Sequence, residues 1–266
     1  MTSPTAPPDP PPTLRALYAA HEGKVSQKWE LYLDVYDAAL SPWRSQPVTL
    51  VEIGVQNGGS LELWAKYFAA GRRFVGCDVD PKVATLRFDD PRIATVVAPV
   101  NTAAAAREIV ARAGAPIDIF IDDGSHLSSD IVMAFRNYFP LVRAGGIYIA
   151  EDLHCAYRRG WQGGLTAPNA VSFFKALVDA MHQPYWDEGE SMQALAQPYL
   201  PGDAASDLAR LAASVASVAF FDSMCLVRKR PADGWGRLGG RVVAGREALV
   251  DPAPLSAADR ADRADR

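Results

Sequence analysis

Cysteine is scarce in this sequence and positive charge is not in excess, and each shortage excludes a class of protein. Three cysteines in 266 residues, far apart along the chain, cannot form a disulfide framework and lack the spacing of a zinc site. We expect them to be free thiols in a reducing compartment. Asp and Glu (31) outnumber Lys and Arg (27), so the net charge of −4 gives no basic footprint for a nucleic acid.

Long apolar runs are also missing. No stretch approaches the ~20 apolar residues that a membrane-spanning helix requires, and the N-terminal sequence MTSPTAPPDPPPT lacks the basic and then apolar order of a signal peptide. We therefore expect a cytoplasmic protein with no membrane partner. Hydrophobic residues make up 49% of the chain, which is enough for one large α/β domain with a full core.

The composition divides the chain into four parts. Residues 1–12 are rich in proline, and residues 231–266 are rich in Gly, Arg, Ala and Asp, so both are predicted to be disordered tails. Residues 13–45 form a helical lead in two pieces around Gly23. Residues 46–230 are predicted to form the main domain.

The second piece of the lead carries three aromatic residues on one face, Trp29, Tyr32 and Tyr36. The simpler interpretation is that this face packs against the edge of a sheet. The alternative is that these side chains help to cover a ligand cleft. Taken alone, the pattern favours simple packing.

Apolar, β-prone stretches alternate with helical patterns in the main domain. Strands are predicted over 48–55, 72–80, 92–100, 117–123 and 145–152, with helices between them, including 128–145. This alternation predicts a parallel sheet with helices on both faces. After a polar loop at 156–169, a helix at 171–183 and an irregular insertion at 184–211, two apolar stretches at 214–223 and 224–230 predict a hairpin.

The first predicted strand leads into a glycine-rich turn, VEIGVQNGGS. Gly54 and Gly58 let the backbone approach a ligand closely, Asn57 lies in the same turn, and Ser60 is a candidate N-cap for the next helix. The spacing differs from the dinucleotide motif GxGxxG. The turn also contains no Lys or Arg that would bind a phosphate.

Polar residues at the next strand ends extend this pattern into a nucleoside pocket. Asp78 can accept hydrogen bonds from both hydroxyls of a ribose, whereas Asp80 is better explained as a turn cap. Asn101 can meet an adenine edge or cap the following helix, and by itself the cap is the simpler explanation. Glu52 is unusual, because an acid inside an apolar strand costs free energy unless it meets donors. An acidic nucleoside pocket without a phosphate-binding cation favours S-adenosylmethionine, whose sulfonium is positively charged.

Two acid pairs follow the fourth and fifth predicted strands, and each precedes a histidine. The residues are Asp122, Asp123 and His126 in IDIFIDDGSH, and Glu151, Asp152 and His154 in GGIYIAEDLH. Ligands of open α/β sheets bind beyond the carboxyl ends of such strands. One acid pair could be only a turn or a helix cap, but two pairs on neighbouring strands favour a site.

The motifs VEIGVQNGGS, GCDVD, IDDGSH and AEDLH resemble those of class I S-adenosylmethionine-dependent methyltransferases, over about residues 25–228. The subgroup is the metal-dependent macrolide and sugar O-methyltransferases, with macrocin, mycinamicin and cephalosporin hydroxylase relatives. The resemblance implies a Rossmann-like, mostly parallel seven-stranded sheet with helices on both faces and a C-terminal antiparallel hairpin. It also implies that residues 46–230 are the methyltransferase domain, and that the protein is a dimer or tetramer.

The resemblance further implies a divalent metal, Mg²⁺, bound by Asp123, Glu151 and Asp152, with His126 as the general base. Carboxylate oxygens suit this hard cation, and a histidine can accept a proton near neutral pH. Strand alternation would turn Asp122 away from Asp123, toward the cofactor or into a turn. The residues predicted to bind S-adenosylmethionine are Glu52, Gly54, Asn57, Gly58, Ser60, Asp78, Asn101 and Asp122.

The predicted function is Mg²⁺-dependent transfer of a methyl group from S-adenosylmethionine to a sugar hydroxyl of a glycoside, glycan or natural product. The metal would orient two neighbouring hydroxyls and acidify one of them. One alternative is a catechol-type O-methyltransferase, which would bind an aromatic vicinal diol in the same way. The other is an accessory protein that binds the cofactor without catalysing transfer.

Overall fold

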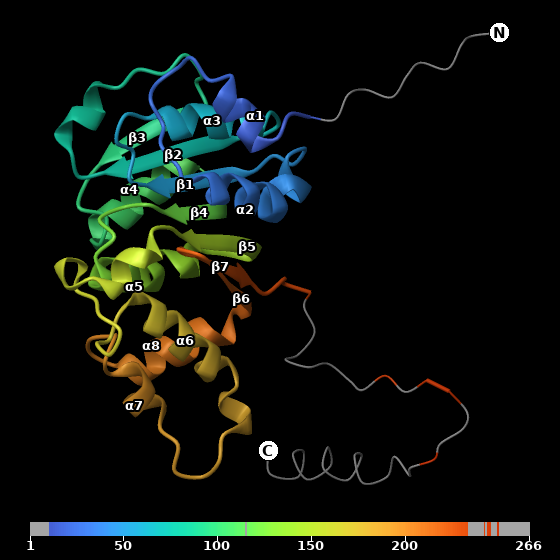
Figure 1. Cartoon of the computed structure of the whole chain (residues 1–266), viewed down its shortest axis with the longest axis vertical. Coiled ribbons are helices and arrows are strands. Elements are labelled where there is room, and N and C mark those ends of the chain that lie inside the picture. The colour runs from blue at the N-terminus through green and yellow to red at the C-terminus, as the bar shows by residue number, and fades with distance from the viewer. Residues whose placement is uncertain (1–10, 115, 234–241, 243, 246–248, 250–266) are drawn as a thin grey trace. The chain divides into compact units, whose positions relative to one another are not determined.

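A computed structural model describes residues 11–114, 116–233, 242, 244–245 and 249 (Figure 1). The chain divides into two compact units, Met1–Ala232 and Asp233–Arg266, and every element named below lies in the first. The predicted disordered tails, 1–12 and 231–266, fall largely outside the described residues. Within the described part, no helix has the length and apolar character needed to cross a membrane.

The first unit is built on a seven-stranded sheet with the order β3-β2-β1-β4-β5-β7-β6. The strands are β1 (Thr49–Ile53), β2 (Arg73–Asp78), β3 (Ile93–Val97), β4 (Ile117–Asp122), β5 (Val142–Ala150), β6 (Val215–Phe221) and β7 (Met224–Lys229). Strands β1 to β5 are parallel, and β7 is antiparallel to both β5 and β6. The structure therefore confirms the predicted fold class, including the final hairpin.

Helices cover both faces of this sheet, so its central strands are apolar on both sides. The α-helices are α1 (Leu14–Ala19), α2 (Glu30–Leu40), α3 (Gly59–Tyr67), α4 (Ala103–Ala113), α5 (Ser128–Tyr138), α6 (Ala170–Met181), α7 (Met192–Ala196) and α8 (Ala204–Ala213). Successive residues of β4 enter opposite cores: Phe120 packs with residues of α4, α5 and α6, whereas Ile119 and Ile121 pack with residues of α2 and α3. This period of two is the pleat of a strand.

Short 3₁₀ helices occupy several connections: η1 (Ser41–Trp43), η2 (Pro81–Thr85), η3 (Phe139–Leu141), η4 (Leu153–Tyr157), η5 (Arg159–Trp161) and η6 (Gln183–Tyr185). One of them corrects the helix predicted over 128–145. That helix ends at Tyr138, and η3 contains Pro140, whose ring lacks the N–H that a continuing helix needs. Strand β5 consequently begins at Val142, three residues before the predicted start.

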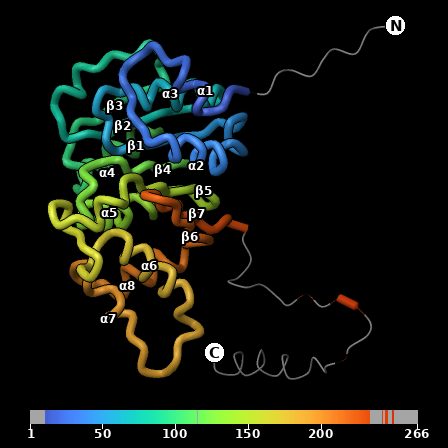
Figure 2. Tube along the Cα trace, viewed as in Figure 1, coloured from blue at the N-terminus to red at the C-terminus, as the bar shows by residue number. Residues whose placement is uncertain are grey.

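The connection between α1 and α2, residues 20–29, lies on the N-terminal turn of α3 (Figure 2). The backbone N–H and the ammonium of Lys24 both bind the carboxylate of Glu62, at 2.9 and 2.7 Å. A Cβ atom on Gly59 would lie 2.0 Å from the carbonyl oxygen of Lys24. This close contact fixes the connection, hereafter the lead segment, beside the glycine-rich turn.

Candidate active site

Two adjoining hollows lie beyond the carboxyl ends of the parallel strands. The larger, of about 560 Å³, is lined by six of the predicted site residues: Gly54, Asp78, Asp123, His126, Glu151 and Asp152. The smaller, of about 210 Å³, is lined by Asn101 and Asp122 and shares Gly54, Asp78 and Gly124 with the larger. The sheet edge that the sequence predicted as a site therefore contains two hollows with a shared wall.

Gly54 is required where the ends of β1 and β4 approach each other. Its φ of +89° is in the left-handed region, and a Cβ there would lie 1.9 Å from the carbonyl oxygen of Asp123. Gly58, with φ +85°, is the N-cap residue of α3, so the predicted N-cap role of Ser60 is wrong. Ser60 lies inside the helix, and its hydroxyl donates to Oε2 of Glu52 at 2.6 Å.

Glu52 is fully buried beneath the larger hollow. Besides the Ser60 hydroxyl, it accepts a hydrogen bond from the indole of Trp64 at 3.4 Å. Burial raises the pKa of Glu52, although nearby positive charge opposes the shift. Glu52, Asn57, Gly58 and Ser60 are not among the residues that line the two hollows, so their contact with a cofactor stays a prediction.

Asp78 presents a carboxylate to both hollows. It accepts backbone N–H bonds from Val55 at 2.8 Å, Gln56 at 3.1 Å and Asp80 at 3.0 Å. Burial alone would raise the pKa of Asp78, but these backbone donors outweigh it and lower the pKa. Asp80 accepts from the backbone of Lys82 and caps η2, as predicted for a turn residue.

Asn101 and Asp122 line the smaller hollow. The cap of α4 is Thr102, so the interpretation of Asn101 as that cap is wrong. Its Nδ2 donates to the carbonyl of Asp130 at 3.2 Å, and its Oδ1 is buried with no hydrogen-bond partner among the described residues. Asp122 accepts from the hydroxyl of Tyr148 at 2.8 Å, and burial raises its pKa to about 7. A side-chain amide with one unused acceptor can pair with an adenine edge if it turns toward the hollow.

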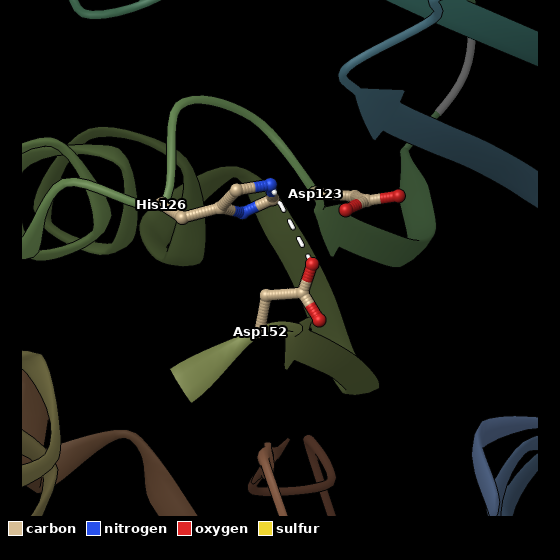
Figure 3. Close-up of side chains that lie close together, drawn as sticks. All are labelled: Asp123, His126 and Asp152. Carbon is tan, nitrogen blue, oxygen red and sulfur yellow. Dashed lines mark ion pairs between the residues drawn. The ribbon is translucent and has the colours of Figure 1, made fainter. Parts of the chain in front are cut away.

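Asp123 belongs to two groups of metal-type ligand atoms, each group within 4.8 Å across. Glu52, Asp123 and Glu151 form the inner acid group, and Asp123, His126 and Asp152 form the outer acid group. Figure 3 shows the outer group, with a dashed line from His126 to Asp152, whose Nε2 and Oδ2 atoms are 3.5 Å apart. The predicted ligands Glu151 and Asp152 therefore fall in different groups that share Asp123.

Lys28, a residue of the lead segment, lies among the carboxylates of the inner acid group. Its ammonium donates to Oδ2 of Asp123 and to Oε1 of Glu151 at 2.7 Å, and lies 3.6 Å from Oε1 of Glu52. The side chain is only 3% exposed. Burial alone would lower the pKa of Lys28, but the attraction of the three carboxylates holds it well above its ordinary value. Sequence reasoning missed this residue, because nothing in QKWELYL separates Lys28 from a surface lysine.

The aromatic face of the lead also reaches the acids. The Tyr36 hydroxyl donates to Glu151, and the Tyr32 hydroxyl donates to Oδ1 of Asp152 at 2.7 Å. The indole of Trp29 donates to the same oxygen at 3.2 Å. The structure supports both interpretations of this face. Tyr32 and Tyr36 pack in the core against the sheet, as simple packing predicts. Trp29 and Tyr32 also line the larger hollow, as a cover over the cleft predicts.

Three residues that line the larger hollow have strained backbones. Gln56, His126 and Asp152 have φ values of 50°, 58° and 54°, a region that residues with side chains seldom adopt. Such conformations persist only where the surroundings enforce them, and they accumulate at functional sites. At Asp152, the hydrogen bonds from Tyr32 and Trp29 supply that enforcement.

The donor set fits a hard divalent cation. Carboxylate oxygens dominate both acid groups, and oxygen ligands are those that Mg²⁺ prefers. The Lys28 ammonium, itself a cation, already lies among the inner carboxylates, so the surroundings accommodate positive charge there. Asp123 would be a ligand in either group, with Glu151 or Asp152 beside it.

Comparison with known proteins finds that the chain is similar to methyltransferases. Residues 51–153 match the family model described as a methyltransferase domain. The chain is 35% identical to 8-demethyl-8-alpha-L-rhamnosyl tetracenomycin-C 2'-O-methyltransferase of Streptomyces olivaceus, over 86% of this chain and 62% of that protein. It is 37% identical to mycinamicin VI 2''-O-methyltransferase of Micromonospora griseorubida, over 56% of this chain and 39% of that protein.

A solved methyltransferase structure is also similar to this chain. MycE methyltransferase in complex with Mg, SAH and mycinamycin VI is 26% identical, with a TM-score of 0.66, over 85% of this chain and 56% of that chain. The present chain spans less than two thirds of each of these three proteins. The matches confirm the predicted resemblance to sugar O-methyltransferases.

Proposed function

The chain carries a methyltransferase domain and is a relative of the S-adenosylmethionine-dependent sugar O-methyltransferases, and from that premise we propose that it is a metal-dependent sugar O-methyltransferase. In the proposed reaction a sugar hydroxyl oxygen forms a bond to the methyl carbon of S-adenosylmethionine. The carbon–sulfur bond breaks, its electrons stay on sulfur, and the hydroxyl loses its proton. The observation that carries this proposal is the outer acid group, with His126 among its members, at the mouth of a hollow that also contains Asp78.

The two adjoining hollows suit the two parts of the cofactor. Asp78 remains ionised and faces both hollows, so it can accept hydrogen bonds from ribose hydroxyls. Asn101 lines the smaller hollow, and its side-chain amide can pair with an adenine edge once it turns toward the cavity. Gly54, shared by both hollows, leaves room for the cofactor to pass between them.

The acids at the larger hollow suit the acceptor side of the reaction. A bound Mg²⁺ would orient two neighbouring hydroxyls and make one more acidic. His126 is held close to Asp152, and its imidazole can accept the proton that the reacting hydroxyl loses. The buried Tyr32 hydroxyl and the exposed Trp29 indole both bind the other carboxylate oxygen of Asp152, so the base and this carboxylate share a fixed geometry.

The proposed acceptor is a glycoside with an apolar aglycone. The named relatives act on a rhamnosyl tetracenomycin and on a mycinamicin, which supports a glycoside in general. A third hollow, of about 400 Å³, lies beside the acids, and its lining includes His154, Tyr157, Phe220 and Phe221. Its aromatic side chains, partly exposed, suit an apolar ring system attached to the reacting sugar.

A panel of acceptors tests the proposal. Purified protein is mixed with S-adenosylmethionine and Mg²⁺, and methylated products of aryl rhamnosides, other deoxysugar glycosides and catechols are measured by mass spectrometry. The proposal expects glycosides to be methylated on a sugar oxygen. Methylation of catechols alone would favour the aromatic diol, and no transfer despite S-adenosylmethionine binding would favour an accessory protein. The dimer or tetramer stays a prediction, which light scattering can test.

A further inference from the structure

Lys28 occupies the place of a cation within the inner acid group, and we infer that its ammonium is a built-in competitor of the metal ion. In the structure the ammonium pairs with Asp123 and Glu151. A divalent cation that binds both of these carboxylates must displace it. The inference rests on the metal binding proposed above and adds a role for a lysine outside the predicted site.

The inner acid group needs a positive charge beside it. The side chains of Glu52 and Glu151 are 0% and 1% exposed, and buried carboxylates without a partner are costly. Lys28 is the cation that the structure records beside all three inner carboxylates, at positions 11–114 and 116–233. The ammonium carries one positive charge and the group offers three carboxyl groups, so a divalent cation would be attracted to it more strongly than the single ammonium is.

The ammonium and a metal ion would use the same oxygen atoms. Lys28 binds Oδ2 of Asp123 and Oε1 of Glu151, and the ligand atoms of the inner group lie within 4.8 Å of one another. A Mg²⁺ ion would need such oxygens at ~2.0–2.1 Å. Two cations in so small a space repel each other strongly, because little water is present to screen them. Occupancy by Lys28 and occupancy by the metal are therefore mutually exclusive for the inner group.

The structure also offers the displaced ammonium a destination. Lys28 lines the larger hollow, so its long side chain can swing into that space without movement of the backbone. The backbone itself is fixed on both sides of Lys28, by the bonds of Lys24 to Glu62 and of Trp29 to Asp152. Only the side chain has to exchange places with the metal.

Metal affinity tests the inference directly. Lys28→Met removes the charge and keeps most of the side-chain length, and Lys24→Met is the matched control, because Lys24 lies in the same segment but pairs with Glu62. Mn²⁺ binding is measured by electron paramagnetic resonance without cofactor or acceptor. Loss of the competing charge should tighten Mn²⁺ binding at least about tenfold in Lys28→Met, and the control should stay within about twofold of wild type. In EDTA the Lys28→Met protein should melt at a lower temperature, and saturating Mg²⁺ should remove the difference.

Equal or weaker Mn²⁺ binding by Lys28→Met would overturn the inference while leaving metal-dependent transfer intact. If neither protein binds Mn²⁺, both the inference and the proposed metal site fail. Amine acetylation of the wild-type protein tests displacement without any substitution. Lys28 should react several-fold faster in saturating Mg²⁺ than in EDTA, with Lys24 unchanged, and equal rates of Lys28 labelling would overturn the inference.

Discussion

The hydroxyl of Tyr32 lies 2.7 Å from a carboxylate oxygen of Asp152, a residue 120 positions further along the chain. The same hydroxyl accepts the backbone N–H of Asp152 at 3.1 Å and lies 2.8 Å from the hydroxyl of Ser223. A buried residue of the N-terminal lead thus holds an acid at the end of β5 in its left-handed conformation.

Replacement of Tyr32 by Phe should make the Asp152 side chain more mobile. The change removes the donor to a charged group, which should lower the free energy of unfolding by about 1–3 kcal/mol. It should also weaken Mn²⁺ binding, because Asp152 would no longer be held in place. Urea denaturation and Mn²⁺ titration measure the two effects. Tyr185→Phe, at an exposed position, is the control, and equal values for the two variants would contradict the role assigned to Tyr32.

His126→Asn should lower kcat by about 10²–10⁴, the usual contribution of a general base. Asn tolerates the left-handed backbone that His126 adopts, so the fold should be kept. The dissociation constant of S-adenosylhomocysteine, measured by calorimetry, should change less than about twofold. His182→Ala is the control, since His182 binds a carbonyl of its own helix. Near-normal turnover of His126→Asn would show that another group accepts the proton.

Asp78→Asn should change the pH dependence of stability. The pKa of Asp78 is lowered in the folded protein from the ordinary value of 3.8, so its ionised form stabilises the fold above that pH, and this stabilisation is lost as the pH falls through the folded-state pKa. Wild type should therefore be more stable than Asp78→Asn by a constant amount from pH 8 to about 5, and the difference should shrink below about pH 4. Chemical denaturation across this range measures it. A difference that does not depend on pH would contradict the lowered pKa.

Phe221→Ala should raise KM for glycosides with large aromatic aglycones. Phe221 lines the third hollow and is 42% exposed, so its loss should cost little stability. KM for a methyl glycoside should stay unchanged, because such an acceptor has nothing to place in that hollow. Leu165→Ala, at a more exposed apolar position outside the hollow, is the control. Equal KM changes for the two acceptors would show that the aglycone does not bind in this hollow.

The strand ends of the site could be predicted from the sequence because their pattern is local. A short apolar run followed by acids and glycine marks the end of a buried strand, and parallel strands end at one edge. Asp78, Asp123, His126 and Asp152 come together for that reason. The predicted end of the 128–145 helix was wrong for a local reason as well. Pro140 cannot continue a helix, so the sequence itself marks an earlier end.

Lys28 could not be predicted, because its partners lie far from it in the sequence. The lead segment has no periodicity of its own, and its position depends on contacts with α3 such as Lys24 with Glu62. Asp123, its partner, lies 95 positions away. The sequence also could not predict which way the Glu151 and Asp152 side chains point. The left-handed backbone at Asp152 ends the alternation of β5.

The requirement for a metal tests the central claim most directly. Protein stripped with EDTA is mixed with S-adenosylmethionine carrying a labelled methyl group and with an aryl rhamnoside, and label in the sugar product is counted before and after Mg²⁺ is added. The account predicts no transfer above background without metal, recovery with Mg²⁺, and no recovery in Asp123→Asn, since Asp123 belongs to both acid groups. Undiminished transfer in EDTA would contradict it.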